Sequence, residues 1–128
     1  MKGRDLLAVA RRLGSGQNPT EPNRRTSINR SYYAAFGELS GHIQVRGYVR
    51  KPSGSPHDAS WKFLKTGIVD GDVQRAAVRR AIADTGFQLK ARRLKADYQL
   101  SAGISRTEPQ DALGEAEAII KALDSLKA

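Results

Sequence analysis

Three short segments of the sequence hold side chains that could bind or act on phosphate groups. In each, charged or amide residues stand beside aromatic residues, and the segments are RTSINRSYYAAF at 25–36, PHDASWKFLKTG at 56–67 and LKARRLKADY at 89–98. Arginine and lysine contact phosphate oxygens, histidine moves protons near neutral pH, and aromatic rings stack on bases. The candidate residues in these segments are Arg25, Asn29, Arg30, His57, Lys90, Arg92, Arg93 and Lys95.

The net charge of the chain favours the same kind of partner. Its 128 residues include 22 Lys and Arg against 13 Asp and Glu, which gives a formal net charge of +9. Such a basic balance in a chain of this length is typical of proteins that bind RNA or DNA, although many basic surfaces bind nothing. RNA is therefore the first partner to test.

Composition argues against several other classes. No apolar run is longer than the five residues Leu6–Ala10, which is too short to span a membrane, and the basic residues around it argue against a signal peptide or an anchor. The sequence has no cysteine, and its two histidines have no acidic cluster nearby, so we expect no disulfide, metal site or cofactor. We predict one domain over residues 1–128, located in the cytoplasm.

Hydrophobic residues recur at helical spacing through most of the chain and predict an all-α fold. The expected helices cover residues 6–13, 24–47, a short stretch that opens at His57 or Asp58, 72–98 with a weak point at 84–86, and a last helix from Pro109. Turn-forming residues at 14–23 and 51–56 separate the first three helices. Trp61 and Leu64 are expected to anchor the short one.

The helix at 24–47 is expected to be the central one. Its apolar stripe consists of Ile28, Tyr32, Phe36, Leu39 and Ile43. Arg25 and Asn29 fall inside the same arc. Asn29 is therefore expected to satisfy backbone or tyrosine hydroxyl groups, whereas Arg25, near the helix start, could equally reach solvent. Arg30 lies on the outward side.

The stretch at 87–98 is expected to face the core along one line. That line consists of Phe87, Ala91, Leu94 and Tyr98. Asp97 is expected to pair with Arg25 or Arg30 across the bundle. The basic strip at 90–95 is interpreted as a solvated helix face or, alternatively, as a contact to the RNA backbone. His42, on the flank of the central helix, is expected to be half-exposed.

Together, the three segments resemble the HEPN superfamily, a group of small helical domains in prokaryotic toxin, defence and nucleotide-metabolism systems. The residues that carry the resemblance are R-T-S-I-N-R-S-Y-Y-A-A-F, S-P-H-D-A-S-W-K-F-L-K-T-G and K-A-R-R-L-K-A-D-Y, within a stretch from about Leu6 to Tyr98. The resemblance implies an antiparallel bundle of four to five helices, frequently a homodimer, and in many members a metal-independent endoribonuclease.

In this family the activity usually rests on an arginine followed a few residues later by a histidine, and Arg50 and His57 fit that pattern. Histidine can move the proton of a ribose 2′-hydroxyl or protonate the leaving 5′-oxygen, and arginine stabilises charge on the phosphate. A two-fold dimer that joins two copies of His57 would supply both proton-transfer roles. The sequence departs from the family at Lys51, where a polar Asn, Asp or His is common. In YYA-type relatives the histidine need not be catalytic, and His57 would then cap the third helix or bond to Asn29 or Tyr32.

Two functions from different classes are therefore expected. The first is a toxin or defence-system endoribonuclease that cleaves RNA at a dimer interface through Arg50 and His57. The second is a non-catalytic module that binds a nucleotide or a partner protein, such as an antitoxin, a nucleotidyltransferase or a defence effector. A basic helical DNA-binding protein is a third alternative, although no helix-turn-helix stands out.

Overall fold

The computed structural model describes residues 2–16, 19–50 and 54–127. Its helices are α1 (Gly3–Gly14), α2 (Glu21–Gln44), α3 (Pro56–Lys62), α4 (Val73–Tyr98) and α5 (Glu108–Leu126), and a π-helical turn, η1 (Phe63–Gly67), directly follows α3. The described part of the chain contains no strand, so the predicted all-α fold is confirmed. Within it, every helix is too short or too polar to cross a membrane.

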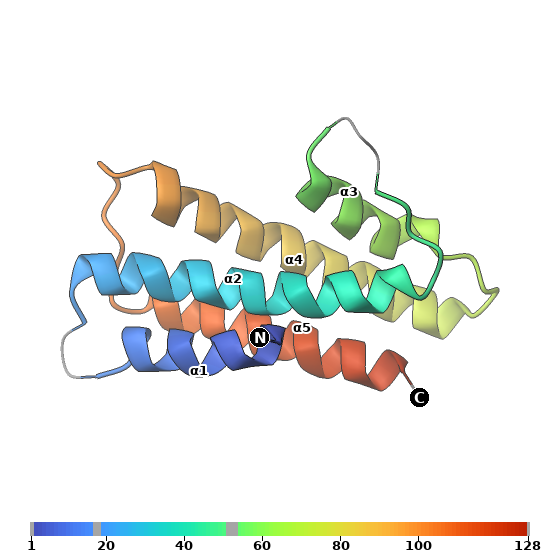
Figure 1. Cartoon of the computed structure of the whole chain (residues 1–128), viewed down its shortest axis with the longest axis horizontal. Helices are drawn as coiled ribbons and strands as arrows, with labels where there is room; N and C mark the ends of the chain where they lie inside the picture. The colour runs from blue at the N-terminus through green and yellow to red at the C-terminus, as the bar shows by residue number, and fades with distance from the viewer. Residues whose placement is uncertain (1, 17–18, 51–53, 128) are drawn as a thin grey trace.

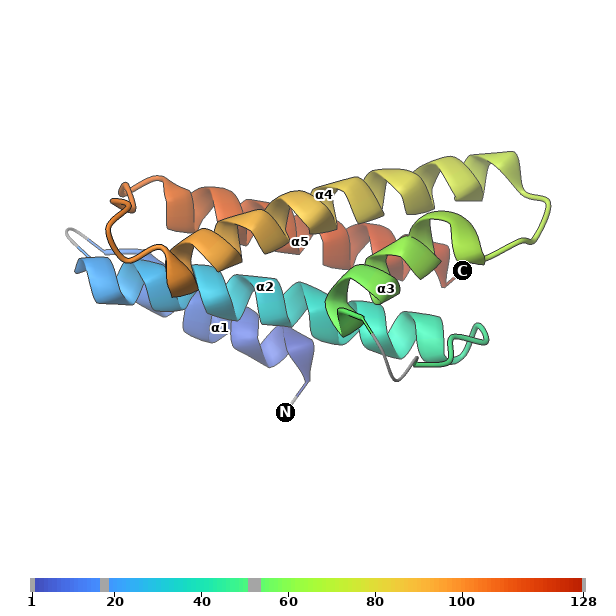
Figure 2. The ribbon, with the colours of Figure 1, turned by 90° about the horizontal axis from the view of Figure 1, so that it is seen from above.

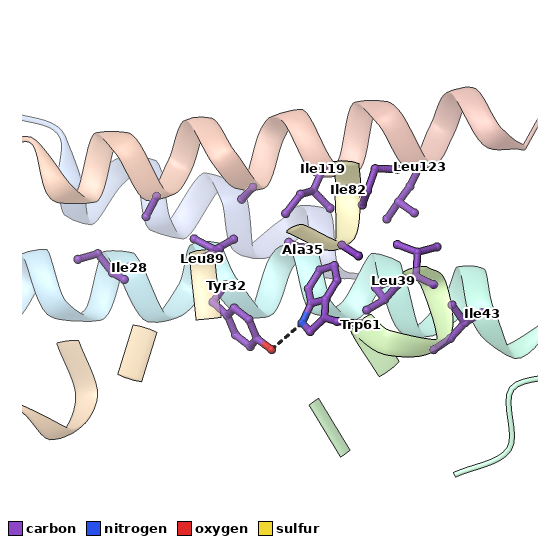
Figure 3. Close-up of a cluster of buried hydrophobic side chains, with 14 of the residues drawn as sticks. Ile28, Tyr32, Ala35, Leu39, Ile43, Trp61, Ile82, Leu89, Ile119 and Leu123 are labelled. Carbon is purple, nitrogen blue, oxygen red and sulfur yellow. Dashed lines mark hydrogen bonds between the residues drawn. The ribbon is translucent and has the colours of Figure 1, made fainter. Parts of the chain in front are cut away.

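Helix α2 lies at the centre of the bundle (Figures 1 and 2). It packs against α1, α4 and α5, and the short α3 lies across α2 and α4 near one end of the molecule. Among the four longer helices, packed neighbours run antiparallel except α2 and α5, which run in the same direction. Figure 3 shows the core, to which α2, α3, α4 and α5 all contribute side chains. Of the stripe predicted on α2, only Phe36 is partly exposed.

The helices that carry the candidate site begin at capping residues. Ser55 caps α3, because its hydroxyl accepts a hydrogen bond from the backbone N–H three residues on, at 3.3 Å, and Pro56 occupies the first turn. This start places His57 in the first turn of α3. Helix α2 begins at Glu21, earlier than predicted, because Thr20 caps it in the same way.

Helix α4 continues without a break through residues 84–86, where the sequence predicts a weak point. Gly86 is buried there against the indole of Trp61, and a Cβ atom at this position would lie 2.4 Å from Cε3 of the indole. The glycine therefore permits close approach of α3 to α4 and is not a helix end.

The apolar line predicted on α4 faces the core only at Phe87, which packs against it. Leu94 is 36% exposed and Tyr98 is 69% exposed, whereas Leu89 is fully buried. The orientation of α4 about its own axis follows from Gly86. Because this residue must face the indole of Trp61, the side of α4 that includes Leu89 faces the core and most of the predicted line faces outward. The prediction that Tyr98 belongs to the core is wrong.

His42, predicted to be half-exposed, is only 3% exposed. Both of its ring nitrogens are buried without a hydrogen-bond partner in the described residues. Burial above all, and then the positive charges of Arg46, Lys127, Arg75 and Arg79, lowers the pKa of His42 to about 4. The imidazole is therefore neutral in the folded protein at neutral pH.

Stability is expected to fall as the pH drops from 6.5 toward 4. The ordinary pKa is 6.5, so the unfolded chain binds a proton at His42 that the folded chain does not take up until about pH 4. The contribution of His42 to the free energy of unfolding is complete above pH 6.5. It declines as the pH falls from 6.5 toward 4, and at pH 5 it is about 2 kcal/mol smaller. His42→Leu removes the titrating group, so urea unfolding at pH 7.5 and pH 5 should show a smaller loss in the variant. An equal loss in both proteins would contradict this assignment.

Candidate functional site

His57 sits where α2, α3 and α4 meet. Its Nδ1 atom lies 2.7 Å from the hydroxyl oxygen of Tyr32, and its ring stacks on that of Phe36, with centroids 4.2 Å apart and planes at 15°. The ring of Tyr33 meets the imidazole edge-on at 5.9 Å. Of the alternatives predicted for His57, the bond to Tyr32 is confirmed, whereas the hydroxyl of Ser55 caps the helix.

A pocket of about 340 Å³ opens between the C-terminal half of α2, the segment that follows it and the start of α3. Arg50 and His57, which the sequence pairs, both line it. The other lining residues are Phe36, Ser40, Ile43, Gln44, Tyr48, Pro56 and Ser60. The pocket thus combines aromatic rings, hydroxyl and amide groups and one guanidinium, at the lower end of the volume range of small-ligand pockets. Lys51, next to Arg50, lies outside the described residues.

The surroundings of His57 favour its neutral form. Burial lowers the pKa of His57, the positive charges of Arg93 and Lys90 lower it further, and the carboxylate of Asp58 opposes them. Asp58 is itself in a salt bridge of 2.5 Å with Lys90. A neutral imidazole offers one N–H donor and one lone pair, on different nitrogens.

A polar network beside the imidazole joins α2 to α4. Asp97 accepts hydrogen bonds at Oδ2 from Nδ2 of Asn29, at 3.0 Å, and from Nε of Arg93, at 2.9 Å. Arg30 donates to Oδ1 of Asn29 at 2.5 Å. The prediction that Asp97 pairs with Arg25 or Arg30 is wrong, because Arg93 lies one turn away on the same helix and reaches the carboxylate directly. Asn29 correspondingly binds two charged groups, and not the backbone or tyrosine hydroxyl groups predicted for it.

Three tyrosines frame the guanidinium of Arg93. Its Cζ atom lies 5.2 Å from the ring centroid of Tyr33 and 5.7 Å from those of Tyr32 and Tyr98, which are distances typical of cation–π contacts. The side chain is 12% exposed and is bonded to Asp97. Arg93 therefore organises this face of the bundle, and little of its surface is open to a ligand.

The basic strip at 90–95 does not form one open face. Arg92 and Lys95 point toward α5, where they pair with Glu115 at 2.7 Å and with Glu108 at 2.8 Å. The other two cations of the strip pair with carboxylates on the opposite side of α4. Because all four charges are offset by carboxylates and divided between two sides, the strip offers no continuous track for a phosphate backbone.

Arg25 closes the C-terminal end of α4 and does not reach into solvent. Its side chain is 12% exposed, and Nη1 donates to the backbone carbonyls of Lys95, Ala96 and Gln99 at 3.3, 2.9 and 3.3 Å. Nη2 donates to the carboxylate of Glu21 at 2.7 Å. Carbonyls at a helix end lack partners within the helix, so these bonds fix the turn that holds the polar network.

Sequence reasoning misses most of the residues that line the pocket. Phe36, Ser40 and Gln44 recur at intervals of four on α2 and so share one face, which is the available signal. Ser60 comes from α3 and Tyr48 from the segment after α2. Only the packing of α3 on α2 brings those two side chains to the same space, and no local pattern predicts it.

Comparisons with protein-family models, with curated proteins and with solved structures found no match. Among the described residues, no group of three or more histidine or acidic side chains is arranged to hold a metal ion. The resemblance to the HEPN superfamily therefore rests on the three sequence segments.

Proposed function

We propose that this protein is a HEPN-type module that binds a nucleotide, free or as one unit of an RNA strand, in the pocket lined by Arg50 and His57. The observation that carries the proposal is the composition of the pocket: a guanidinium and an imidazole share it with the rings of Phe36 and Tyr48. Nucleotides present a phosphate and a flat base, and these are the groups that guanidinium and aromatic side chains recognise.

Arg50 is the residue best placed to bind the phosphate. It is exposed, and no carboxylate among the described residues pairs with it, in contrast to the basic strip at 90–95. An arginine without a partner can form two parallel hydrogen bonds to phosphate oxygens. Ser40 and Gln44 supply neutral donors and acceptors that could contact the sugar or the base, and the hydroxyl of Ser60, which donates to the carbonyl of Pro56, can still accept.

The second candidate function is a metal-independent endoribonuclease of the toxin or defence type, acting as a homodimer on RNA. The presence of Arg50 and His57 in one pocket supports it as well. Its test is incubation of the purified protein with tRNA and mRNA in EDTA, compared with His57→Ala. Cleavage that the variant loses would support catalysis, and equal cleavage by both proteins, or by neither, would contradict it.

Location in the cytoplasm and association with an antitoxin, a nucleotidyltransferase or a defence effector belong to the same proposal. The binding function predicts stable association with such a partner and no toxicity on overexpression. The nuclease function predicts toxicity that the partner suppresses. Co-expression and growth assays therefore separate the two functions.

Arg50→Gln is expected to weaken nucleotide binding about tenfold, because a hydrogen bond to a charged group contributes roughly 1.5 to 3 kcal/mol. Calorimetric titration with adenosine monophosphate and with a short single-stranded RNA measures the effect. Much tighter binding of the RNA would identify a strand as the ligand, and equal affinity would identify the free nucleotide.

Arg12→Gln is the matched control for this titration. Arg12 is exposed on α1, which does not line the pocket, and its replacement lowers the net charge by the same amount. The control variant should keep the affinity of the wild type, apart from the small general effect of charge on RNA binding. Equal weakening by the two substitutions would contradict a specific role of Arg50.

A further inference from the structure

The hydroxyl of Tyr32 lies between two nitrogen atoms inside the bundle. Nε1 of Trp61 donates a hydrogen bond to the hydroxyl oxygen (dashed line in Figure 3), and the two atoms are 3.1 Å apart; Nδ1 of His57 is 2.7 Å from the same oxygen. Both Tyr32 and Trp61 are fully buried. Solvent therefore cannot supply a substitute donor or acceptor to the hydroxyl.

The chemistry of these three groups fixes where the protons lie. An indole N–H can only donate, so the hydroxyl oxygen accepts a hydrogen bond from Trp61. The hydroxyl has one proton of its own, and Nδ1 of His57 is the acceptor within reach of it among the described residues. If Nδ1 carried the proton, the oxygen would accept twice and the buried hydroxyl proton would have no partner, which is costly.

We infer that Trp61 and Tyr32 are positioning residues that hold His57 in one tautomer, with the lone pair at Nδ1 and the proton at Nε2. The same hydrogen bond opposes the imidazolium form, because a protonated Nδ1 cannot accept it. The nearby positive charges of Arg93 and Lys90 act in the same direction. The pocket residue His57 therefore presents an N–H donor.

This inference deepens the proposed function and, where it concerns the ligand, rests on it. An N–H at Nε2 selects a hydrogen-bond acceptor, such as a phosphate oxygen, a base carbonyl or an unprotonated ring nitrogen. A histidine in this tautomer cannot take up a proton at Nε2, so His57 is a recognition group and not a general base in the resting protein. Cleavage of RNA with His57 as base would require the opposite tautomer.

The test is the tautomer of His57 in the free wild-type protein, read from the two-bond proton–nitrogen NMR correlations of the imidazole at pH 7.5. His42→Leu leaves one histidine and so assigns the signals. We expect a neutral ring with the proton at Nε2, in about tenfold excess or more over the other tautomer. A proton at Nδ1, or an imidazolium, would overturn the inference without use of any ligand.

Two variants test whether the hydrogen bonds that link Trp61, Tyr32 and His57 set the tautomer of His57. Tyr32→Phe removes the donor to Nδ1, and Trp61→Phe removes the bond that commits the hydroxyl to donate. In whichever variant stays folded by circular dichroism, the excess of the Nε2–H form should fall several-fold toward a mixture. An unchanged ratio in a folded variant would show that the hydrogen bonds from Trp61 and Tyr32 do not set the tautomer. If the wild type shows the expected tautomer but does not bind adenosine monophosphate or RNA, the proposed function fails and the positioning role of Tyr32 and Trp61 stands.

Discussion

Gly86→Ala is expected to lower the free energy of unfolding by about 2 kcal/mol or more, although alanine is the better helix former. A Cβ atom at this position would lie 2.4 Å from both Cε3 and Cζ3 of Trp61, and the indole is fully buried. The ring cannot move away without disturbing its bond to Tyr32, which in turn holds His57. Urea unfolding at pH 7.5 measures the change.

Gly114→Ala is the control for this substitution. Gly114 lies within α5, is exposed and has open space where a Cβ atom would be, so alanine should raise stability by up to about 1 kcal/mol. Combining Gly86→Ala with Trp61→Phe removes the indole atoms that clash, and the cost of the double variant should be clearly less than the sum of the single ones. Additive costs would show that Gly86 and Trp61 do not constrain each other.

Arg25→Met is expected to cost about 3 kcal/mol of stability and to loosen the C-terminal end of α4. The side chain bonds to carbonyls of Lys95, Ala96, Gln99 and Ala102, and hydrogen bonds to a charged donor contribute roughly 1.5 to 3 kcal/mol each, without being additive. Methionine retains the apolar stem but leaves these acceptors without the guanidinium. Urea unfolding measures the loss, and hydrogen exchange should show faster exchange of amides near the end of α4.

Arg25→Lys separates charge from geometry. A single ammonium keeps the favourable charge at the helix C-terminus but cannot reach carbonyls spread over more than one turn, so most of the loss should remain. Arg12→Met, on the exposed side of α1, should change stability by less than about 0.5 kcal/mol. Full stability in Arg25→Lys would mean that charge alone matters, and full stability in Arg25→Met would contradict the role of Arg25 in holding the C-terminal end of α4.

The helices of this fold could be predicted because they depend on local patterns. Apolar residues at helical spacing place the long α2, and all of its predicted stripe except Phe36 is buried. The start of α3 at Pro56 lies within two residues of the predicted start at His57 or Asp58. Features encoded within a few neighbouring residues are thus accessible to a single sequence.

Features that depend on contacts between helices could not be predicted in the same way. Asp97 accepts a hydrogen bond from Asn29 on α2, Gly86 packs against an indole on α3, and His42 is buried by the packing of α2 in the bundle. The basic strip at 90–95 is nearly continuous in sequence, yet successive residues of a helix point in different directions, so its charges are divided between two sides of α4. For Gly86 and His42, the side of the helix that faces its neighbours decides the environment, and the sequence pattern predicts this side wrongly.

Part of the candidate site was accessible from the sequence. The resemblance to the HEPN superfamily singles out Arg50 and His57, and the bond from His57 to Tyr32 was one of the predicted alternatives. The rest of the pocket comes from three segments that meet only in the folded chain, so Ser60 and Tyr48 carry no sequence signal for it. The folded chain likewise decides that the rings of Phe36 and Tyr48 line the same pocket.

The central claim is that a nucleotide binds in the pocket between α2 and α3, and its most direct test is to follow the NMR spectrum of the labelled wild-type protein during titration with adenosine monophosphate. We predict saturable shifts of the signals of His57, Ser40, Tyr48 and Ser60, with His57 keeping its proton at Nε2 and with the shifts strongly reduced in Arg50→Gln. A spectrum that does not change at high nucleotide concentration, or saturable shifts confined to the strip at 90–95, would contradict the claim.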